Sequence, residues 1–253
     1  MNTLSVIPVV NLPKFKEGDD IVSILLEHLA HQQLTLERGD VLVLAQKIVS
    51  KVEGRQIPLS SVEPSNQAVQ LAIETEKDPR LVELILQEST EVVRKKPGVL
   101  IVRHKLGHVG AHAGIDQSNI DHSDDGSALL LPIDPDRSAH DIRVKIEDQT
   151  GIEVGVIIAD SANRPWRLGT VGVAIGCSNT EVLTDKRGTI DLFGRELKVT
   201  LSNRADAIAG AANLVMGETT EAIPIAIVRG TDNQSSEDTA TIIHRPLEED
   251  LFR

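Results

Sequence analysis

The sequence predicts an α+β fold with mixed sheets, and three observations support this prediction. Apolar β-branched runs alternate irregularly with stretches of helical periodicity over the 253 residues. Hydrophobic residues make up 40% of the chain and charged residues 25%, which is the balance of a globular protein with a sizeable core. Neither a Gly-x-Gly-x-x-Gly nor a P-loop motif occurs, so a nucleotide site of the Rossmann or P-loop type is not expected. We expect residues 1–253 to form a single domain, or two closely packed subdomains.

Each expected element follows from its local pattern. Apolar β-branched runs predict strands at 5–10, 40–51, 99–111, 153–160, 169–183 and 223–230, with a hairpin or meander through 187–200. Apolar residues at helical spacing predict helices at 19–32, 64–77, 79–96, 135–151 and 203–216. Asp19 or Asp20 is expected to cap the first helix. Ser138 with Asp141 is expected to cap the helix at 135–151, and Gly151 is expected to close it.

Composition excludes several classes of function. The formal charge of −12 argues against nonspecific nucleic-acid binding but suits an anionic small molecule held through divalent cations. Aromatic residues make up only 2% of the chain, so a site built on stacked rings is not expected. The single cysteine, Cys177, excludes an internal disulfide and a cysteine-based zinc cage. No apolar stretch is long enough for a membrane span, and the N-terminus does not read as a signal peptide. The expected location is the cytoplasm, without membrane contact.

The stretch IIADSANRPWR (157–167) ends an apolar strand in a carboxylate and a hydroxyl. Ligands tend to bind beyond the carboxyl ends of strands, and magnesium or manganese prefers such oxygen ligands. Asp160 and Ser161 are therefore candidate metal ligands. Both residue types also cap helices, so a structural turn is the alternative.

Three further segments carry candidate ligand-binding groups. The polar loop 114–127 contains Asp116 and Asn119 within GIDQSNID, which either supplies ligands or forms a local turn. Lys47, Lys51 and Arg55 follow a strand; they either bind phosphate or form a solvated basic edge. GETTE (217–221) joins a helix to the last strand, where Glu218 and two threonines either contact a metal or phosphate or form a surface connection.

Other reactive residue types are less promising. His104, His108 and His112 recur every four residues, as zinc ligands on a helix do, but glycines interrupt a segment that reads as strand and loop. Zinc binding is therefore not expected. Cys177 has no base beside it in the sequence, so it is not expected to be a nucleophile.

Taken together, the segments resemble the coenzyme F420-0:L-glutamate ligase family over nearly the whole chain. GIDQSN and the Asp-Ser/Thr-x-x-Arg-Pro-Trp-Arg pattern, here DSANRPWR, are the most specific parts. Supporting segments are EGDDIVSILLEHL, RGDVLVLAQKIVSKVEGR, KDPRLVELILQEST, LLPIDPDRSA, VAIG, GRELKVT and LVMGETTEAIPIAIVRG.

The resemblance implies a reaction. Members use GTP and two divalent cations, Mg²⁺ or Mn²⁺, with a monovalent cation such as K⁺ as an optional third ion. They join the α-amine of L-glutamate to a carboxylate of an anionic deazaflavin acceptor and release GDP and phosphate. An acyl phosphate formed by phosphoryl transfer fits this chemistry, because a free carboxylate is a poor acyl donor. The resemblance also implies that no covalent protein nucleophile is needed and that members form intimate homodimers.

The resemblance also implies site residues. Asp116 and Asp160 would hold one metal, and Ser161 and Glu218 the second. The residues implied to line the nucleotide are Asn11, Leu12, Pro13, Lys14, Gln46, Lys47, Lys51, Asn119, Met216, Gly217, Thr219 and Thr220. We add Arg164 and Arg167 as candidates for binding carboxylate or phosphate groups of the substrate.

The chain departs from the family pattern at four positions. These are His112, Ile133, Asn163 and Gly172. Because the two aspartates of the first metal are retained, the departures bear mainly on the acceptor. The alternatives are a ligase acting on another carboxylate, a metal-dependent phosphohydrolase, and a non-catalytic nucleotide-binding protein.

Overall fold

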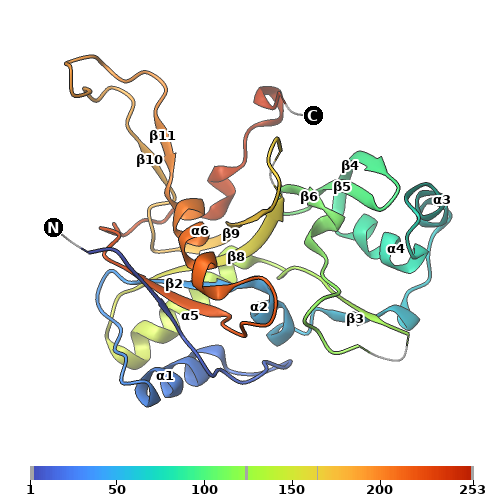
Figure 1. The fold of residues 1–253 in the computed structure, drawn as a ribbon, viewed down its shortest axis with the longest axis horizontal. Coiled ribbons are helices and arrows are strands. Elements are labelled where there is room, and N and C mark those ends of the chain that lie inside the picture. Colours follow the sequence, from blue (N-terminus) through green and yellow to red (C-terminus); the bar gives the residue numbers. More distant parts are fainter. Residues whose placement is uncertain (1–2, 123–124, 164, 252–253) are drawn as a thin grey trace.

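The structure is a computed structural model that describes residues 3–122, 125–163 and 165–251. Its larger part is built on one mixed sheet of strand order β1-β12-β2-β8-β9 (Figure 1). The strands are β1 (Ser5–Pro8), β2 (Val41–Ala45), β8 (Gly155–Asn163), β9 (Thr170–Ser178) and β12 (Ile225–Arg229). β2 and β8 run parallel, whereas the other neighbouring strands are antiparallel. This sheet with its helices confirms the predicted α+β class.

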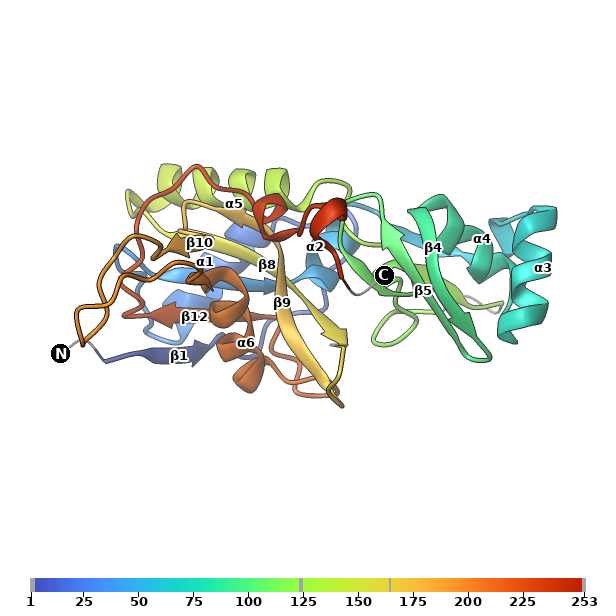
Figure 2. The same cartoon turned by 90° about the horizontal axis from the view of Figure 1, so that it is seen from above.

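Helices cover both faces of this sheet. The helices are α1 (Ile21–His31), α2 (Gln46–Val52), α5 (Pro135–Thr150) and α6 (Arg204–Met216). Apolar residues of α1, α2 and α5 share one buried cluster with alternate strand residues such as Leu42 and Ile158. Residues of α6 share a second cluster with the intervening strand residues, such as Val43 and Ile157. The period of two along each strand therefore divides the core into two layers, and α6 packs on the opposite face from α5 (Figure 2).

A small lobe lies at the other end of the molecule (Figures 1 and 2). It contains β3 (Gln56–Pro58), β4 (Ser89–Lys96), β5 (Val99–His104), β6 (Val109–Ala111), β7 (Ser127–Leu129), α3 (Asn66–Thr75) and α4 (Pro79–Gln87). Strands β4, β5 and β6 form an antiparallel sheet, and β3 pairs with β7. A third buried cluster, containing Leu84, Ile85 and Leu100, stabilises this lobe.

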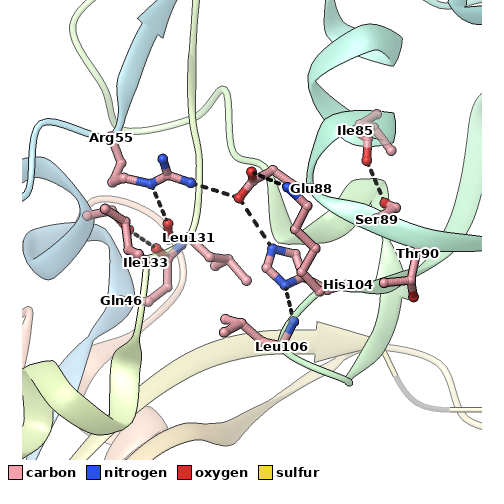
Figure 3. Close-up of polar contacts among 12 residues, drawn as sticks. Gln46, Arg55, Ile85, Glu88, Ser89, Thr90, His104, Leu106, Leu131 and Ile133 are labelled. Carbon is pink, nitrogen blue, oxygen red and sulfur yellow. Dashed lines mark hydrogen bonds and ion pairs between the residues drawn. The ribbon is translucent and has the colours of Figure 1, made fainter.

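A polar network joins the small lobe to the segment that follows α2 (Figure 3). The Arg55 guanidinium donates to the Leu131 carbonyl at 2.9 Å and to the Glu88 carboxylate at 2.7 Å. His104 Nε2 lies 3.6 Å from the same carboxylate, and its Nδ1 accepts from the Leu106 N–H. The His104 contact and the Arg55 charge hold the pKa of Glu88 below its ordinary value. The network therefore links both parts of the molecule through the Glu88 carboxylate, which Arg55 and His104 both contact.

The remaining ordered elements are short. β10 (Leu183–Asp185) and β11 (Leu201–Asn203) pair with each other, and the loop between them projects from the body (Figure 1). We call this loop, residues 186–200, the arm. The 3-10 helices are η1 (Leu59–Ser61), η2 (His112–Gly114), η3 (Ala240–Ile243) and η4 (Leu247–Glu249). Within the described part of the chain, no helix is long and apolar enough to cross a membrane.

Some predicted elements were wrong in their extent or type; the strand predicted at 169–183, for example, ends at Ser178. The strand predicted at 40–51 ends at Ala45, and the same apolar run continues as α2. Ile48 and Val49 of α2 are buried like the apolar residues of β2, so hydrophobicity alone could not locate this change. The helix predicted at 79–96 ends at Gln87, and the residues after it form β4 against β5. The β-branched residues Thr90, Val92 and Val93 favour that strand.

The helix caps were predicted with mixed success. Asp20 caps α1 by accepting from the Ser23 N–H, and Gly151 ends α5 with a positive φ of 70°, both as predicted. The predicted cap of α5 was wrong. Asp134 rather than Ser138 accepts from the Arg137 N–H, because the helix begins at Pro135, a residue that suits a first helical position.

Candidate functional site

An open cavity of about 410 Å³ lies where β2 ends and α2 begins. Its lining comes from segments far apart in the sequence, including the residues before α1, the start of α2, the loop after η2, the end of β8 and the loop after α6. Because β2 stops here while its neighbour β8 continues, the side chains of β8 beyond this point face a space that no strand fills.

The register of β8 explains the positions of Asp160 and Ser161. The last residue pair between β2 and β8 is Ala45 with Ala159, so Asp160 lies one residue beyond the end of β2. On its other side β8 stays paired with β9 as far as Asn163. The prediction that the strand ends at Asp160 was therefore wrong. Since alternate side chains of a strand face opposite sides, Asp160 and Ser161 contact different partners around one cavity.

Asp160 belongs to an anionic group with Asp116. Gln46 is 1% exposed, and its amide donates to Asp116 at 2.9 Å while its carbonyl oxygen accepts from Ser50. Lys47 Nζ lies 3.3 Å from the other Asp116 oxygen. Burial and the charge of Asp116 raise the pKa of Asp160 to about 7, and burial raises the pKa of Asp116 as well. Two carboxylates that disfavour each other's ionised form would be stabilised by a cation between them.

Ser161 belongs to a second group on the other face of β8. Its hydroxyl donates to Glu218 Oε1 at 2.8 Å. The amide of Asn213, in the last turn of α6, donates to the same oxygen at 2.8 Å. The Glu218 carboxylate is therefore held by two donors from two different elements.

Three lysines supply positive charge to the same cavity. Lys14, Lys47 and Lys51 line it. Burial lowers the pKa of Lys51, and the charges of Lys47 and Lys14 add to this effect, whereas Asp121 opposes it. Positive groups that repel one another at a cavity are suited to an anionic ligand with several charges.

The loop after η2 and the loop after α6 meet at the cavity. The Asn119 amide donates to the Thr219 carbonyl at 3.0 Å. Lys51 Nζ donates to the Asn119 carbonyl at 2.7 Å, and Lys47 Nζ donates to Ser118 Oγ at 3.1 Å. Asn119 adopts a positive φ of 56°, a conformation that Asn tolerates better than most residues. The two lysines and the Asn119 amide thus hold this loop in place.

The structure brings most of the predicted site residues together. The predicted residues that line the cavity are Leu12, Pro13, Lys14, Gln46, Lys47, Lys51, Asn119, Asp160, Ser161, Met216, Gly217, Glu218, Thr219 and Thr220. Asp116 lies directly behind Gln46 and Lys47, which it contacts. Asn11 and Arg167 are exposed and are not part of the lining, and Arg164 lies outside the described residues.

Sequence reasoning missed other residues of the lining. Asn213 and Ala209 lie where α6 packs on Gly172 of β9, a residue that the sequence marked only as a departure from the family pattern. Asn213 gave no signal because a single Asn inside a helix of small residues belongs to no motif. Asp121 was one of the polar groups that the GIDQSNID segment offered, but its place near Lys51 depends on the fold of that loop.

The donor set fits divalent cations of the magnesium type. All the candidate ligands are oxygen atoms, as Mg²⁺ and Mn²⁺ prefer. In the parts of the chain that the structure describes, no three His, Cys, Asp or Glu side chains form a group that could hold an ion alone. An ion bound by two protein carboxylates would complete its shell with water or phosphate oxygens, which is the usual arrangement for Mg²⁺.

The histidines and the cysteine lie outside this site. His104 and His108 stack with ring centroids 4.8 Å apart, and burial lowers the pKa of His108 to about 3. Cys177 is buried, and this burial raises the pKa of its thiol far above the ordinary value. A thiol held in its neutral form is a poor nucleophile.

The fold and the cavity define an α+β protein with a charged ligand site formed by distant segments. Comparison with known proteins adds the class of enzyme, a ligase. The family model described as F420-0:Gamma-glutamyl ligase matches residues 9–230.

Curated relatives agree with this match over almost the full chain. The Coenzyme F420:L-glutamate ligase of Methanopyrus kandleri is 46% identical over 228 residues, which cover 90% of this chain and 87% of the relative. The enzyme of the same name from Methanocaldococcus jannaschii is 44% identical, covering 96% and 95%, and that from Archaeoglobus fulgidus is 44% identical, covering 99% and 96%. The chain belongs to the F420-0:gamma-glutamyl ligase family, which confirms the resemblance found in the sequence.

The four departures from the family pattern lie in different places. Gly172 lines the cavity beside α6. Asn163 is the last residue of β8, His112 is in η2, and Ile133 is exposed ahead of α5. Only Gly172 among these four is part of the lining, so it is the departure that bears most directly on the ligand site.

Proposed function

We propose that this protein is a GTP-dependent ligase that joins the α-amine of L-glutamate to a carboxylate of an F420-0-type deazaflavin acceptor. Family membership supports the ligase reaction, and the names of the relatives support glutamate and the F420 coenzyme. The choice of GTP, the divalent cations and the acyl-phosphate route are inferences from the cavity and from the resemblance.

One observation supports the nucleotide and metal chemistry most strongly. The cavity brings three ammonium groups, from Lys14, Lys47 and Lys51, close to the carboxylates of Asp160 and Glu218 and to that of Asp116 behind them. A triphosphate bound with divalent cations requires both kinds of group, because lysines contact phosphate oxygens while carboxylates hold the cations.

In this proposal Asp116 and Asp160 hold one cation, and Ser161 and Glu218 hold the second. When bound, such ions neutralise phosphate charge and favour phosphoryl transfer. Lys47 and Lys51, which donate to Ser118 and Asn119 in this structure, would contact phosphate oxygens. Gln46 fixes the orientation of Asp116, and Ser50 fixes that of Gln46.

The proposed reaction has two steps. A carboxylate oxygen of the acceptor attacks the γ-phosphorus of GTP, and GDP leaves, which gives an acyl phosphate. The glutamate α-amine then attacks the acyl carbon, loses a proton, and expels inorganic phosphate to form the amide. The protein contributes positioning and charge stabilisation rather than a covalent nucleophile.

We also propose that a second copy of the chain covers the arm. Ile190, Leu192 and Phe193 are large apolar side chains of the arm that are more than half exposed. Residues 186–200 contain four basic and two acidic side chains, a net charge of +2 in a chain of net charge −12. A basic, apolar projection on an acidic protein is complementary to another copy of the same protein.

The direct test combines the full chain with GTP, Mn²⁺, L-glutamate and the deazaflavin acceptor. Mass spectrometry is expected to find an acceptor heavier by one glutamyl residue, with GDP formed in equal amount. Product is expected to disappear without glutamate, without nucleotide, or with EDTA. A reaction with ATP in place of GTP measures the nucleotide preference.

Other results would support other functions. Nucleotide cleavage at the same rate without glutamate and acceptor would indicate a phosphohydrolase. Nucleotide binding without any product would indicate a binding protein. GDP release that depends on glutamate and on a different acid would retain the ligase chemistry and replace the acceptor.

A further inference from the structure

Asn213 has no place in the motifs of the sequence, yet its side chain lies at the centre of the second group. It donates to Glu218 Oε1 at 2.8 Å, and Ser161 donates to the same oxygen at the same distance. One carboxylate oxygen of Glu218 therefore accepts two hydrogen bonds. The other oxygen, Oε2, accepts from neither of these donors.

The packing of α6 on β9 places Asn213 there. Ser161 of β8 is the register partner of Gly172 of β9. A Cβ atom at Gly172 would lie 2.6 Å from the Ala209 carbonyl oxygen and 3.1 Å from Asn213 Cβ. The missing side chain of Gly172 thus permits the close approach of α6, and this approach brings Asn213 within reach of Glu218.

We propose that Asn213 is a positioning residue that orients Glu218 so that Oε2 is available to a divalent cation. This inference rests on the proposed function, in which Ser161 and Glu218 hold the second cation. A serine oxygen that donates its hydrogen to Glu218 keeps lone pairs for a metal. Ser161 Oγ and Glu218 Oε2 can therefore act together as ligands, while Asn213 neither touches the ion nor carries charge. Groups that orient metal ligands in this way commonly change metal affinity by about 10- to 100-fold when they are removed.

The test is a titration of the full chain with Mn²⁺, with and without GDP. Electron paramagnetic resonance measures the free Mn²⁺ at each point. Asn213→Leu keeps nearly the same side-chain shape and removes the donor. We expect it to weaken Mn²⁺ binding by about 10- to 100-fold. The thermal unfolding temperature of the metal-free protein is expected to change little.

The matched control is Asn203→Ala on the same helix. Asn203 caps α6 by accepting from the Asp206 N–H, so its loss lowers stability through the helix rather than through Glu218. We expect this control to lower the unfolding temperature and to leave Mn²⁺ affinity unchanged. The two variants therefore separate a positioning role from a structural one.

The outcomes distinguish this inference from the proposed function. If the wild-type chain binds no Mn²⁺ with or without GDP, the proposed cation sites are wrong and this inference is wrong with them. If the wild type binds Mn²⁺ and Asn213→Leu binds it equally well, only the role of Asn213 is wrong. A metal-free crystal structure of Asn213→Leu gives a second readout. If the Glu218 carboxylate in that structure keeps its wild-type orientation and its hydrogen bond to Ser161, the inference is also overturned.

Discussion

The Asp160 side chain lies where a negative charge is useful for binding a cation and where the fold disfavours that charge. Its carboxylate is placed beside Asp116 at a cavity, yet burial and the charge of Asp116 raise its pKa from the ordinary value of 3.8 to about 7. The folded protein therefore holds this proton more tightly than the unfolded chain does. The contribution of this proton to the free energy of unfolding is fully present below pH 3.8. It is lost as the pH rises from there through about 7.

This property predicts that Asp160→Asn stabilises the metal-free protein at pH 8. The amide removes a charge that the fold disfavours, so we expect the free energy of unfolding to rise by about 1–3 kcal/mol. At pH 5 the folded carboxyl is protonated but the carboxyl of the unfolded chain, with its ordinary pKa of 3.8, is mostly ionised, so the difference is expected to be clearly smaller than at pH 8. Urea denaturation in EDTA at both pH values measures it.

The same variant is expected to lose ligase turnover, because the amide cannot replace the carboxylate as a ligand. Equal stability of the two proteins at pH 8 would contradict the assigned environment of Asp160. A stabilising effect as large at pH 5 as at pH 8 would show that ionisation is not the cause.

At the scale of elements, two glycines on opposite faces of β9 allow α5 and α6 to pack closely against this strand. A bulge at Ile175 shifts its register with β8, since Ile158 pairs with Gly176 but Ala159 pairs with Ala174. In a regular strand Gly172 and Gly176 would share a face. The bulge instead turns Gly176 toward Pro135 of α5, while Gly172 faces α6.

We therefore expect Gly172→Ala to destabilise the protein by about 1–3 kcal/mol through overpacking. Backbone atoms of α6 lie in the way of the added methyl group, so the helix must move away from β9. Because Asn213 would move with it, Mn²⁺ affinity is expected to fall as well. Chemical denaturation and a metal titration measure the two effects.

Gly210→Ala is the matched control for this prediction. It adds the same methyl group on the facing helix, where the nearest atom, the Gly172 carbonyl oxygen, is 3.7 Å away. Replacing a glycine inside a helix by alanine is expected to stabilise the protein by about 0.5–1 kcal/mol. If both variants changed stability equally, the close approach at Gly172 would not be the cause.

At the scale of the whole molecule, the described aromatic residues are divided between the core and the surface. Phe15 is 5% exposed, whereas Trp166 is 86% exposed and Phe193 is 96% exposed. In a chain with so few aromatic side chains, exposure of two of them costs considerable apolar burial. A partner surface offsets that cost, as the proposed second copy does for Phe193.

We expect the combined change Leu192→Ser and Phe193→Ser to convert a dimer into a monomer. The serines remove the apolar contacts of the arm without altering the core, so the unfolding temperature at low protein concentration is expected to change little. Size-exclusion chromatography with light scattering measures the mass in solution.

Ile73→Ser is the control for this change, since Ile73 is an exposed apolar residue of α3, in the lobe away from the arm. We expect it to leave the mass unchanged. A monomeric wild-type chain would contradict the proposal outright, and a double variant that stays dimeric would place the interface elsewhere.

The sequence by itself determined features that depend on neighbouring residues. The buried run before Asp160, the cap at Asp20, the ending at Gly151 and the family pattern around GIDQSN are all local in origin. Each arises from side-chain periodicity or backbone preference within a few residues.

Only the tertiary structure decided where β2 changes to α2, how far β8 extends, and which face of β8 each acidic group joins. It also revealed Asn213, whose contact with Glu218 depends on the missing side chain of Gly172 about forty residues earlier. Residues from positions 12 to 224 share one cavity because strand register and close helix packing bring them together. Those contacts join residues distant in the chain, so the local pattern of the sequence cannot specify them.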